Sequence, residues 1–155
     1  MFFRTIHLLL VVATLAGCAS RGPALPEPGE AAPLAADAPA GEVALYALAQ
    51  LGVPYAFGGT TPELGFDCSG LVRYVFRRAR NVDLPRTTFE LARAGQSVAP
   101  PALQPGDLLF FNTLRRDYSH VAIYLGDERF IHAPAAGGVV RIESLRAEYW
   151  SRRFN

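Results

Sequence analysis

The spacing of apolar side chains divides the chain into a helical part and a later part made of strands. In residues 41–55 (GEVALYALAQLGVPY), apolar side chains recur every three or four positions, as on one face of a helix. A glycine and a proline then follow and predict the end of that helix. The apolar positions are Val43, Tyr46, Ala47 and Leu51, and the terminating residues are Gly52 and Pro54.

A second amphipathic helix is predicted to begin at Cys68 and to run through Ala79. Its apolar face consists of Leu71, Val72, Val75, Phe76 and Ala79, and its opposite face carries Arg73, Arg77, Arg78 and Arg80. Thr87 and Glu90 have the spacing of a capping box, which predicts a short third helix over Phe89–Ala94.

The spacing of apolar side chains changes after residue 106 and is no longer helical. Residues 107–112, 120–126, 129–133 and 138–145 are short runs rich in β-branched or aromatic side chains, separated by glycine, proline and aspartate. They predict the strands of an antiparallel meander. Helices followed by strands, without β-α-β alternation, indicate an α+β fold.

Residues 120–133 (HVAIYLGDERFIHA) predict a hairpin that turns around Gly126-Asp127. If the numbers of opposing residues have an even sum, His120 and His132 lie on the same face of the sheet. With a three-residue loop centred on Gly126, they lie directly opposite each other, with Cβ atoms about 5 Å apart. An odd sum would place them on opposite faces, and the sequence alone allows both.

The N-terminus predicts an exported protein. Residues 1–17 have a short basic segment followed by roughly ten apolar residues, which is too short to span a bilayer and fits a signal peptide. The ending LAGC resembles a bacterial lipobox, which would make Cys18 a lipidated N-terminus; an ordinary signal peptide or membrane anchor is the alternative. The resemblance to outer-membrane lipoproteins, with Ala19 and not aspartate after that cysteine, implies the outer membrane, facing the periplasm. Residues 18–40, rich in proline and alanine, predict a disordered tether, and residues 41–155 a single domain.

Charge and cysteine content narrow the possibilities further. The chain has 15 basic and 14 acidic residues, and removal of the signal peptide takes away one arginine, so the mature chain is formally neutral. A neutral surface gives no support to nucleic-acid binding. The chain has two cysteines, and if Cys18 is lipidated, Cys68 has no partner for a disulfide.

An unpaired cysteine at the start of a helix is a candidate nucleophile. The free N–H groups and partial positive charge of a helix N-terminus favour the thiolate and lower its pKa. The predicted mature chain has two histidines, His120 and His132, and a histidine beside the thiol would complete an ion pair and later protonate a leaving amine. The alternative is that Cys68 fills space in the core. Asp67 before it is expected to cap the helix or pair with an arginine such as Arg86.

Six segments together resemble the NlpC-type cell-wall peptidases, a bacterial branch of the papain-like superfamily. They are LGVPYAFGG, FDCSGLVRYVF, LPRTT, LQPGDLLFF, SHVAIYLG and FIHA, in the family's order and covering the domain from about Val43 to Arg153. The resemblance implies a papain-like fold in which the catalytic cysteine begins a helix packed on an antiparallel sheet. It makes Cys68 the nucleophile, His120 the general base and acid, and His132 the residue that orients it. It also suggests that the Tyr55 hydroxyl and the Cys68 backbone N–H bind the oxyanion or substrate.

The implied function is hydrolysis of amide bonds in peptidoglycan stem peptides without a cofactor. The bond is either the D,D cross-link between diaminopimelate and D-alanine, slightly favoured, or that between D-glutamate and diaminopimelate. A papain-like amidase or acyltransferase and a non-catalytic wall-binding lipoprotein are the alternatives. A zinc site made of Cys68 and the two histidines is disfavoured, because the usual ligand spacings are absent.

Overall fold

The structure, a computed structural model, describes residues 40–135 and 137–155, which belong to one compact unit of the chain. The predicted signal peptide, the lipidation site Cys18 and the tether up to residue 39 lie outside the described residues. Within the described ranges, no helix has both the length and the apolar character needed to cross a bilayer.

The three predicted helices are present. They are α1 (Ala40–Leu48), α2 (Cys68–Arg80) and α3 (Thr88–Ala94). The first helix ends at Leu48, earlier than predicted. Leu51 lies in the turn that follows and is 46% exposed. In α2 the apolar face is buried except for the half-buried Phe76, whereas Arg77 and Arg78 are exposed. The predicted capping box begins α3, with Thr87 and Glu90 each bonded to the other's backbone N–H.

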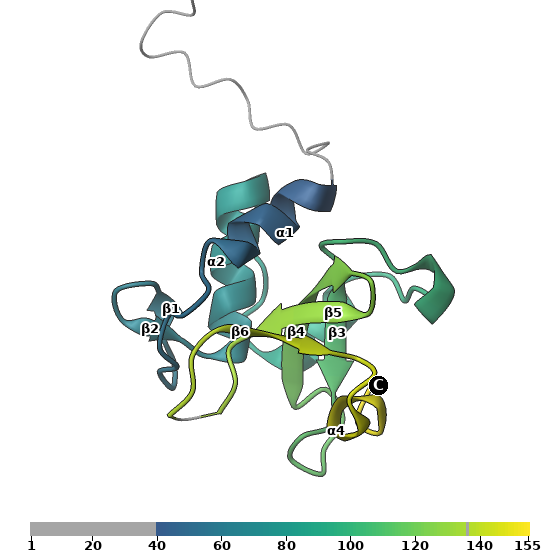
Figure 1. The fold of residues 1–155 in the computed structure, drawn as a ribbon. Helices are drawn as coiled ribbons and strands as arrows, with labels where there is room; N and C mark the ends of the chain where they lie inside the picture. The colour runs from purple at the N-terminus through teal and green to yellow at the C-terminus, as the bar shows by residue number, and fades with distance from the viewer. Residues whose placement is uncertain (1–39, 136) are drawn as a thin grey trace, which may run out of the picture. The chain divides into compact units, whose positions relative to one another are not determined.

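The predicted meander is also confirmed. It is a four-stranded antiparallel sheet in the order β3-β4-β5-β6, and with the helices it makes an α+β fold (Figure 1). The strands are β3 (Leu108–Phe111), β4 (His120–Gly126), β5 (Arg129–His132) and β6 (Arg141–Ser144). Four short elements were not predicted: β1 (Thr60–Thr61), β2 (Gly65–Phe66), the 3₁₀ turn η1 (Pro100–Ala102) and α4 (Glu148–Ser151).

Alternation along the strands divides the buried side chains between the two faces of the sheet. Val121, Ile123 and Ile131 join the cluster that contains the apolar face of α2. The alternate positions Ala122, Tyr124 and Phe130 join a second cluster that contains Trp150 of α4. The catalytic candidates His120 and His132 have even numbers too, so they belong to the face on which α4 packs.

The β4–β5 hairpin differs in detail from the predicted one. Its loop is Asp127-Glu128, two residues that both have positive φ, instead of a three-residue loop centred on Gly126. Beside this loop Gly126 pairs with Arg129, so the two residue numbers have an odd sum. If this register continued along the strands, it would place the two histidines on opposite faces. A β-bulge between Tyr124 and Gly126 shifts the register by one residue, and Tyr124 then pairs with Phe130. The histidines therefore share a face but are offset by two residues from the directly opposite arrangement.

Candidate active site

Cys68 is the first residue of α2 and follows strand β2 after a single residue. That residue, Asp67, has an extended backbone and is the N-cap of the helix. The Cys68 side chain is half-buried and forms no disulfide. The structure therefore places the predicted nucleophile at the helix N-terminus.

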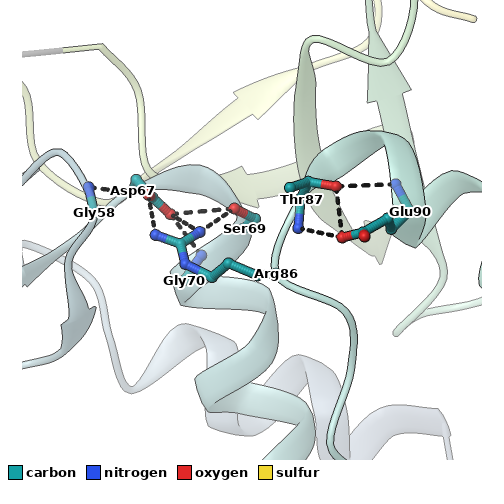
Figure 2. A network of polar contacts seen from close by, with 7 residues as sticks. All are labelled: Gly58, Asp67, Ser69, Gly70, Arg86, Thr87 and Glu90. Atoms are coloured by element: carbon teal, nitrogen blue, oxygen red, sulfur yellow. Dashed lines mark hydrogen bonds and ion pairs between the residues drawn. The ribbon is translucent and has the colours of Figure 1, made fainter.

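A network of hydrogen bonds around the Asp67 carboxylate fixes this turn of the chain (Figure 2). Its Oδ1 accepts hydrogen bonds from the Gly70 N–H at 2.7 Å and from Arg86 Nη1 at 3.1 Å. Its Oδ2 accepts from the Gly58 N–H at 3.1 Å and from Arg86 Nη2 at 2.5 Å. The Ser69 hydroxyl also donates to Oδ1, at 3.3 Å, and accepts from Arg86 Nη1 at 2.6 Å. Both roles expected of Asp67, helix cap and arginine partner, are confirmed.

The same turn is pressed against the loop before β1. The Asp67 N–H donates to the Gly59 carbonyl oxygen at 3.2 Å. A Cβ atom on Gly70 would lie 2.0 Å from that oxygen, so a larger residue at this position would push the helix away from the loop. The absence of a side chain on Gly70 thus permits the close approach that places Cys68 beside this loop.

His120 and His132 form a hydrogen-bonded pair, with His120 Nε2 and His132 Nδ1 2.8 Å apart. The two rings are perpendicular, at an interplanar angle of 89°. His120 is buried and His132 is fully buried. Burial lowers the pKa of His120 to about 4. The pKa of His132 falls to about 3, mainly through burial, with smaller contributions from the charges of His120 and Arg141. Both imidazoles are therefore neutral at pH 7.

The Cys68 thiol of α2 faces the start of β4. There it interacts with the backbone N–H of Val121, the residue that follows His120. Burial raises its pKa above the ordinary value. The N–H groups of Val121, Ser69 and Cys68 oppose this increase, whereas the negative charge of Asp67 adds to it. The expectation of a lowered pKa at the helix N-terminus is thus wrong for the resting site, because desolvation outweighs the helix N–H groups. At neutral pH the site holds a thiol and neutral imidazoles.

Tyr55 reaches the same region from the loop after α1. Its backbone N–H donates to the Gly138 carbonyl oxygen at 2.8 Å, and it bridges to Phe66 just before Asp67. The pKa of its half-buried phenol is raised, first by burial and then by the nearby charges of Cys68 and Asp67. These interactions place the phenol within electrostatic range of the thiol, and its role in binding an oxyanion stays a prediction.

Sequence reasoning missed Trp150, the single tryptophan of the chain. It lies in the short helix α4, is 7% exposed, and contacts both histidine rings, with centroids 5.8 Å from His120 and 4.9 Å from His132. Its local sequence, EYWSRR, has no recognisable pattern, so no signal within it could have indicated this contact. In the described ranges, no three histidine, cysteine or carboxylate side chains lie close enough together to hold a metal ion.

Comparison with known proteins identifies relatives over most of this domain. The sequence profile of the NlpC/P60 family matches residues 52–155. Gamma-DL-glutamyl hydrolase of Bacillus subtilis is 46% identical over 104 residues, covering 66% of this chain and 25% of that protein. Murein DD-endopeptidase MepS/murein LD-carboxypeptidase of Escherichia coli K12 is 41% identical over 104 residues, covering 67% of this chain and 54% of that protein. The chain thus spans between a quarter and about half of the length of these relatives.

A solved structure gives a useful contrast. RipD of Mycobacterium tuberculosis is similar with a TM-score of 0.59 and 28% identity, covering 70% of this chain and 89% of that one. It is described as a non-catalytic NlpC/p60 domain protein adapted to peptidoglycan binding. The fold therefore occurs with and without catalysis, and the residues of the site have to distinguish the two.

Replacing Arg86 tests whether the Asp67 network holds the turn before Cys68. We expect Arg86→Ala to lower the free energy of unfolding by about 1–2 kcal/mol, because Asp67 and Ser69 lose charge-assisted hydrogen bonds at a partly exposed site. The matched control is Arg77→Ala, whose ion pair with Asp83 is more than half exposed on both sides and should contribute less than about 0.5 kcal/mol. Urea denaturation measures both variants, and equal losses would contradict a special role for Arg86.

The protonation state of Cys68 can be read from its alkylation by iodoacetamide. In the chain from residue 19 onward, Cys68 is the only cysteine. Because its pKa is raised and that of His120 is about 4, the alkylation rate should rise roughly tenfold per pH unit from pH 6 to 9. A rate that is independent of pH between 5 and 8 would instead reveal a thiolate–imidazolium pair. Cys68→Ala, which should not be labelled, is the control.

Proposed function

Because the chain belongs to the NlpC/P60 family, we propose that it is a peptidoglycan endopeptidase, a cysteine peptidase that hydrolyses amide bonds in murein peptides. The membership bears out the resemblance to NlpC-type peptidases and the papain-like form of the α+β fold. The murein endopeptidases of this family are cysteine hydrolases that act on peptidoglycan. The observation that carries the proposal is the placement of the thiol that begins α2 beside the first residues of β4, where His120 is hydrogen-bonded to His132 of β5.

The residues support a thioester mechanism. His120 Nε2 is engaged with His132, so His120 Nδ1 is the nitrogen left to receive the proton of the Cys68 thiol. Sγ attacks the peptide carbonyl carbon, and the resulting oxyanion receives hydrogen bonds from the Cys68 N–H and the Tyr55 hydroxyl. His120 then passes its proton to the leaving amine, which departs as the thioester forms. It next takes a proton from water as the water oxygen attacks the thioester carbonyl carbon. When the C–S bond breaks, His120 returns that proton to sulfur, which frees the thiol and releases the acyl group as a carboxylic acid.

The bond that is cut is inferred from the relatives. The DD-endopeptidase name of the Escherichia coli protein supports the cross-link between diaminopimelate and D-alanine, and we favour that bond. The name of the Bacillus subtilis protein, gamma-DL-glutamyl hydrolase, supports the bond after D-glutamate as the alternative. Both are amides next to a D-residue in a stem peptide, so the same nucleophile and base would serve for either.

A digest of purified peptidoglycan, with products identified by mass spectrometry, tests the activity and the bond together. We expect loss of cross-linked dimers and appearance of tetrapeptide monomers, with Cys68→Ala slower by at least about a thousandfold. New stems ending at D-glutamate would support the other bond. Transfer of the acyl group to an added amine in place of water would indicate an acyltransferase. Binding to the wall without products, unchanged in Cys68→Ala, would contradict the peptidase and favour a binding protein like RipD.

The N-terminal sequence supports attachment to a membrane. The apolar run before Leu15-Ala16-Gly17-Cys18 supports cleavage before Cys18 and lipidation of that cysteine. Attached in this way at the outer membrane facing the periplasm, the domain would lie within reach of the wall.

Metabolic labelling with an alkyne analogue of palmitate tests the anchor. We expect the full chain expressed in a Gram-negative host to be labelled and to sediment with outer membranes. Cys18→Ser should lose both the label and the sedimentation. Labelling that persists in Cys18→Ser, or wild-type protein in the soluble fraction, would contradict lipidation at Cys18.

A further inference from the structure

His132 contains a buried nitrogen without a protein hydrogen-bond partner. Its Nδ1 contacts His120, but its Nε2 has no such partner among the residues that the structure describes. Buried polar atoms are almost always hydrogen-bonded, so an exception at a candidate catalytic residue needs a physical explanation.

The direction of proton transfer, from the Cys68 thiol to His120, decides which ring nitrogen of His132 carries a proton. If His120 Nδ1 is to accept the thiol proton, Nδ1 must be unprotonated, and the neutral His120 ring then carries its proton on Nε2. That Nε2–H donates to His132 Nδ1, so the neutral His132 ring carries its own proton on Nε2. The reverse tautomer would place an N–H of His120 toward the thiol and prevent proton transfer. A base at His120 therefore requires an N–H at the buried Nε2 of His132.

Aromatic rings surround the pair. Trp150 lies roughly parallel to His120, at 29° and 5.8 Å between ring centroids, and perpendicular to His132, at 85° and 4.9 Å. Phe130 also meets His132 edge to face, at 67° and 5.4 Å. In perpendicular arrangements of this kind the edge of one ring can contact the electron-rich face of another, and an indole face is the best such acceptor among protein side chains.

We propose that Trp150 is a positioning residue of the active site, whose indole face receives the His132 Nε2–H and thereby selects the tautomer in which His120 can act as a base. This inference rests on the proposed function of His120. It extends the hydrogen bond between His120 and His132 to an aromatic ring of α4. A single side chain in contact with both imidazoles also sets the angle between them, and it keeps water away from His132.

Among the described residues, Arg141 and Cys68 are charged or titratable groups that approach the pair from neighbouring elements. Arg141 on β6 lies opposite His132 in the strand pairing, and its charge disfavours protonation of His132. The Cys68 thiol approaches from α2 at the start of β4. Burial has the largest effect on both imidazoles, and Trp150 provides part of that burial.

Nitrogen-15 NMR of the histidine side chains in the full chain tests the proposal without any substrate. In the wild type we expect both imidazoles as Nε2–H tautomers at pH 7, titrating near pH 4 and 3. In Trp150→Leu we expect a mixture of tautomers at His132 and titration of both rings at pH values closer to 6.5, because water reaches Nε2. Trp150→Phe, which keeps an aromatic face, should retain the tautomer. Trp150→Met, which fills more of the space but has no aromatic face, should behave as Trp150→Leu and covers the case in which Trp150→Leu does not fold.

Kinetics on soluble muropeptides provide the second readout. We expect kcat/KM of Trp150→Leu to fall about ten- to a hundredfold, mostly through kcat, with its acid limb moved to higher pH, and Trp150→Phe to recover much of the loss. Tyr149→Leu is the matched control on the same helix, since Tyr149 is 49% exposed and contacts Trp150 without a ring contact to either histidine. It should leave tautomers and rates unchanged.

Unchanged histidine tautomers and titration in folded Trp150→Leu or Trp150→Met would overturn the proposal, leaving Trp150 a packing residue. The same would follow if the His132 tautomer changed in Phe130→Leu but not in the Trp150 variants, since Phe130 would then be the acceptor. Because the NMR readout needs no turnover, an inactive wild type with the expected tautomers would count against the peptidase function alone.

Discussion

The candidate active site depends on the hydrogen bonds of the Asp67 carboxylate. Its two oxygens accept hydrogen bonds from the loop before β1, from the first turn of α2 and from Arg86 in the segment that leads to α3. Because Cys68 is the next residue, holding this carboxylate also holds the thiol. A negative charge beside a thiol opposes its ionisation, and the Arg86 guanidinium reduces that effect because it pairs with the same carboxylate. The carboxylate that anchors Cys68 thus also affects the ionisation of its thiol.

A second constraint acts on the sheet. The two-residue loop Asp127-Glu128 matches the twist of the strands, but the pairing that begins at this loop would separate the two histidines. The bulge before Gly126 corrects the register, because one extra residue on β4 moves every later pair by one position. The His120–His132 hydrogen bond therefore depends on an irregularity about four residues from His120, outside the site itself.

The sequence predicted well the features that depend on interactions between residues close together in the chain. The periodicity after Cys68 and the Thr87–Glu90 capping box gave α2 and α3, and the residue types around Cys68 indicated both roles of Asp67. The bulge was not predictable, since Leu125 resembles any apolar strand residue. The two-residue strands β1 and β2 are too short to show a period. The contact of Trp150 with the histidines joins residues distant in sequence, and the raised pKa of Cys68 has the same kind of origin, because burial is set by tertiary packing.

Burial of the thiol and of both imidazoles has a mechanistic consequence. A thiolate–imidazolium pair is unfavourable in a dry site, so in the resting protein the proton stays on sulfur. A neutral thiol is a weak nucleophile, so in the proposed mechanism proton transfer to His120 must accompany attack on the carbonyl. The N–H groups of Cys68, Ser69 and Val121 already favour negative charge on sulfur and are held by a helix and a strand, so they need no reorganisation when that charge develops. Since oxidants attack the thiolate, a site that ionises only during attack, as the proposed mechanism requires, would also protect the Cys68 sulfur between turnovers.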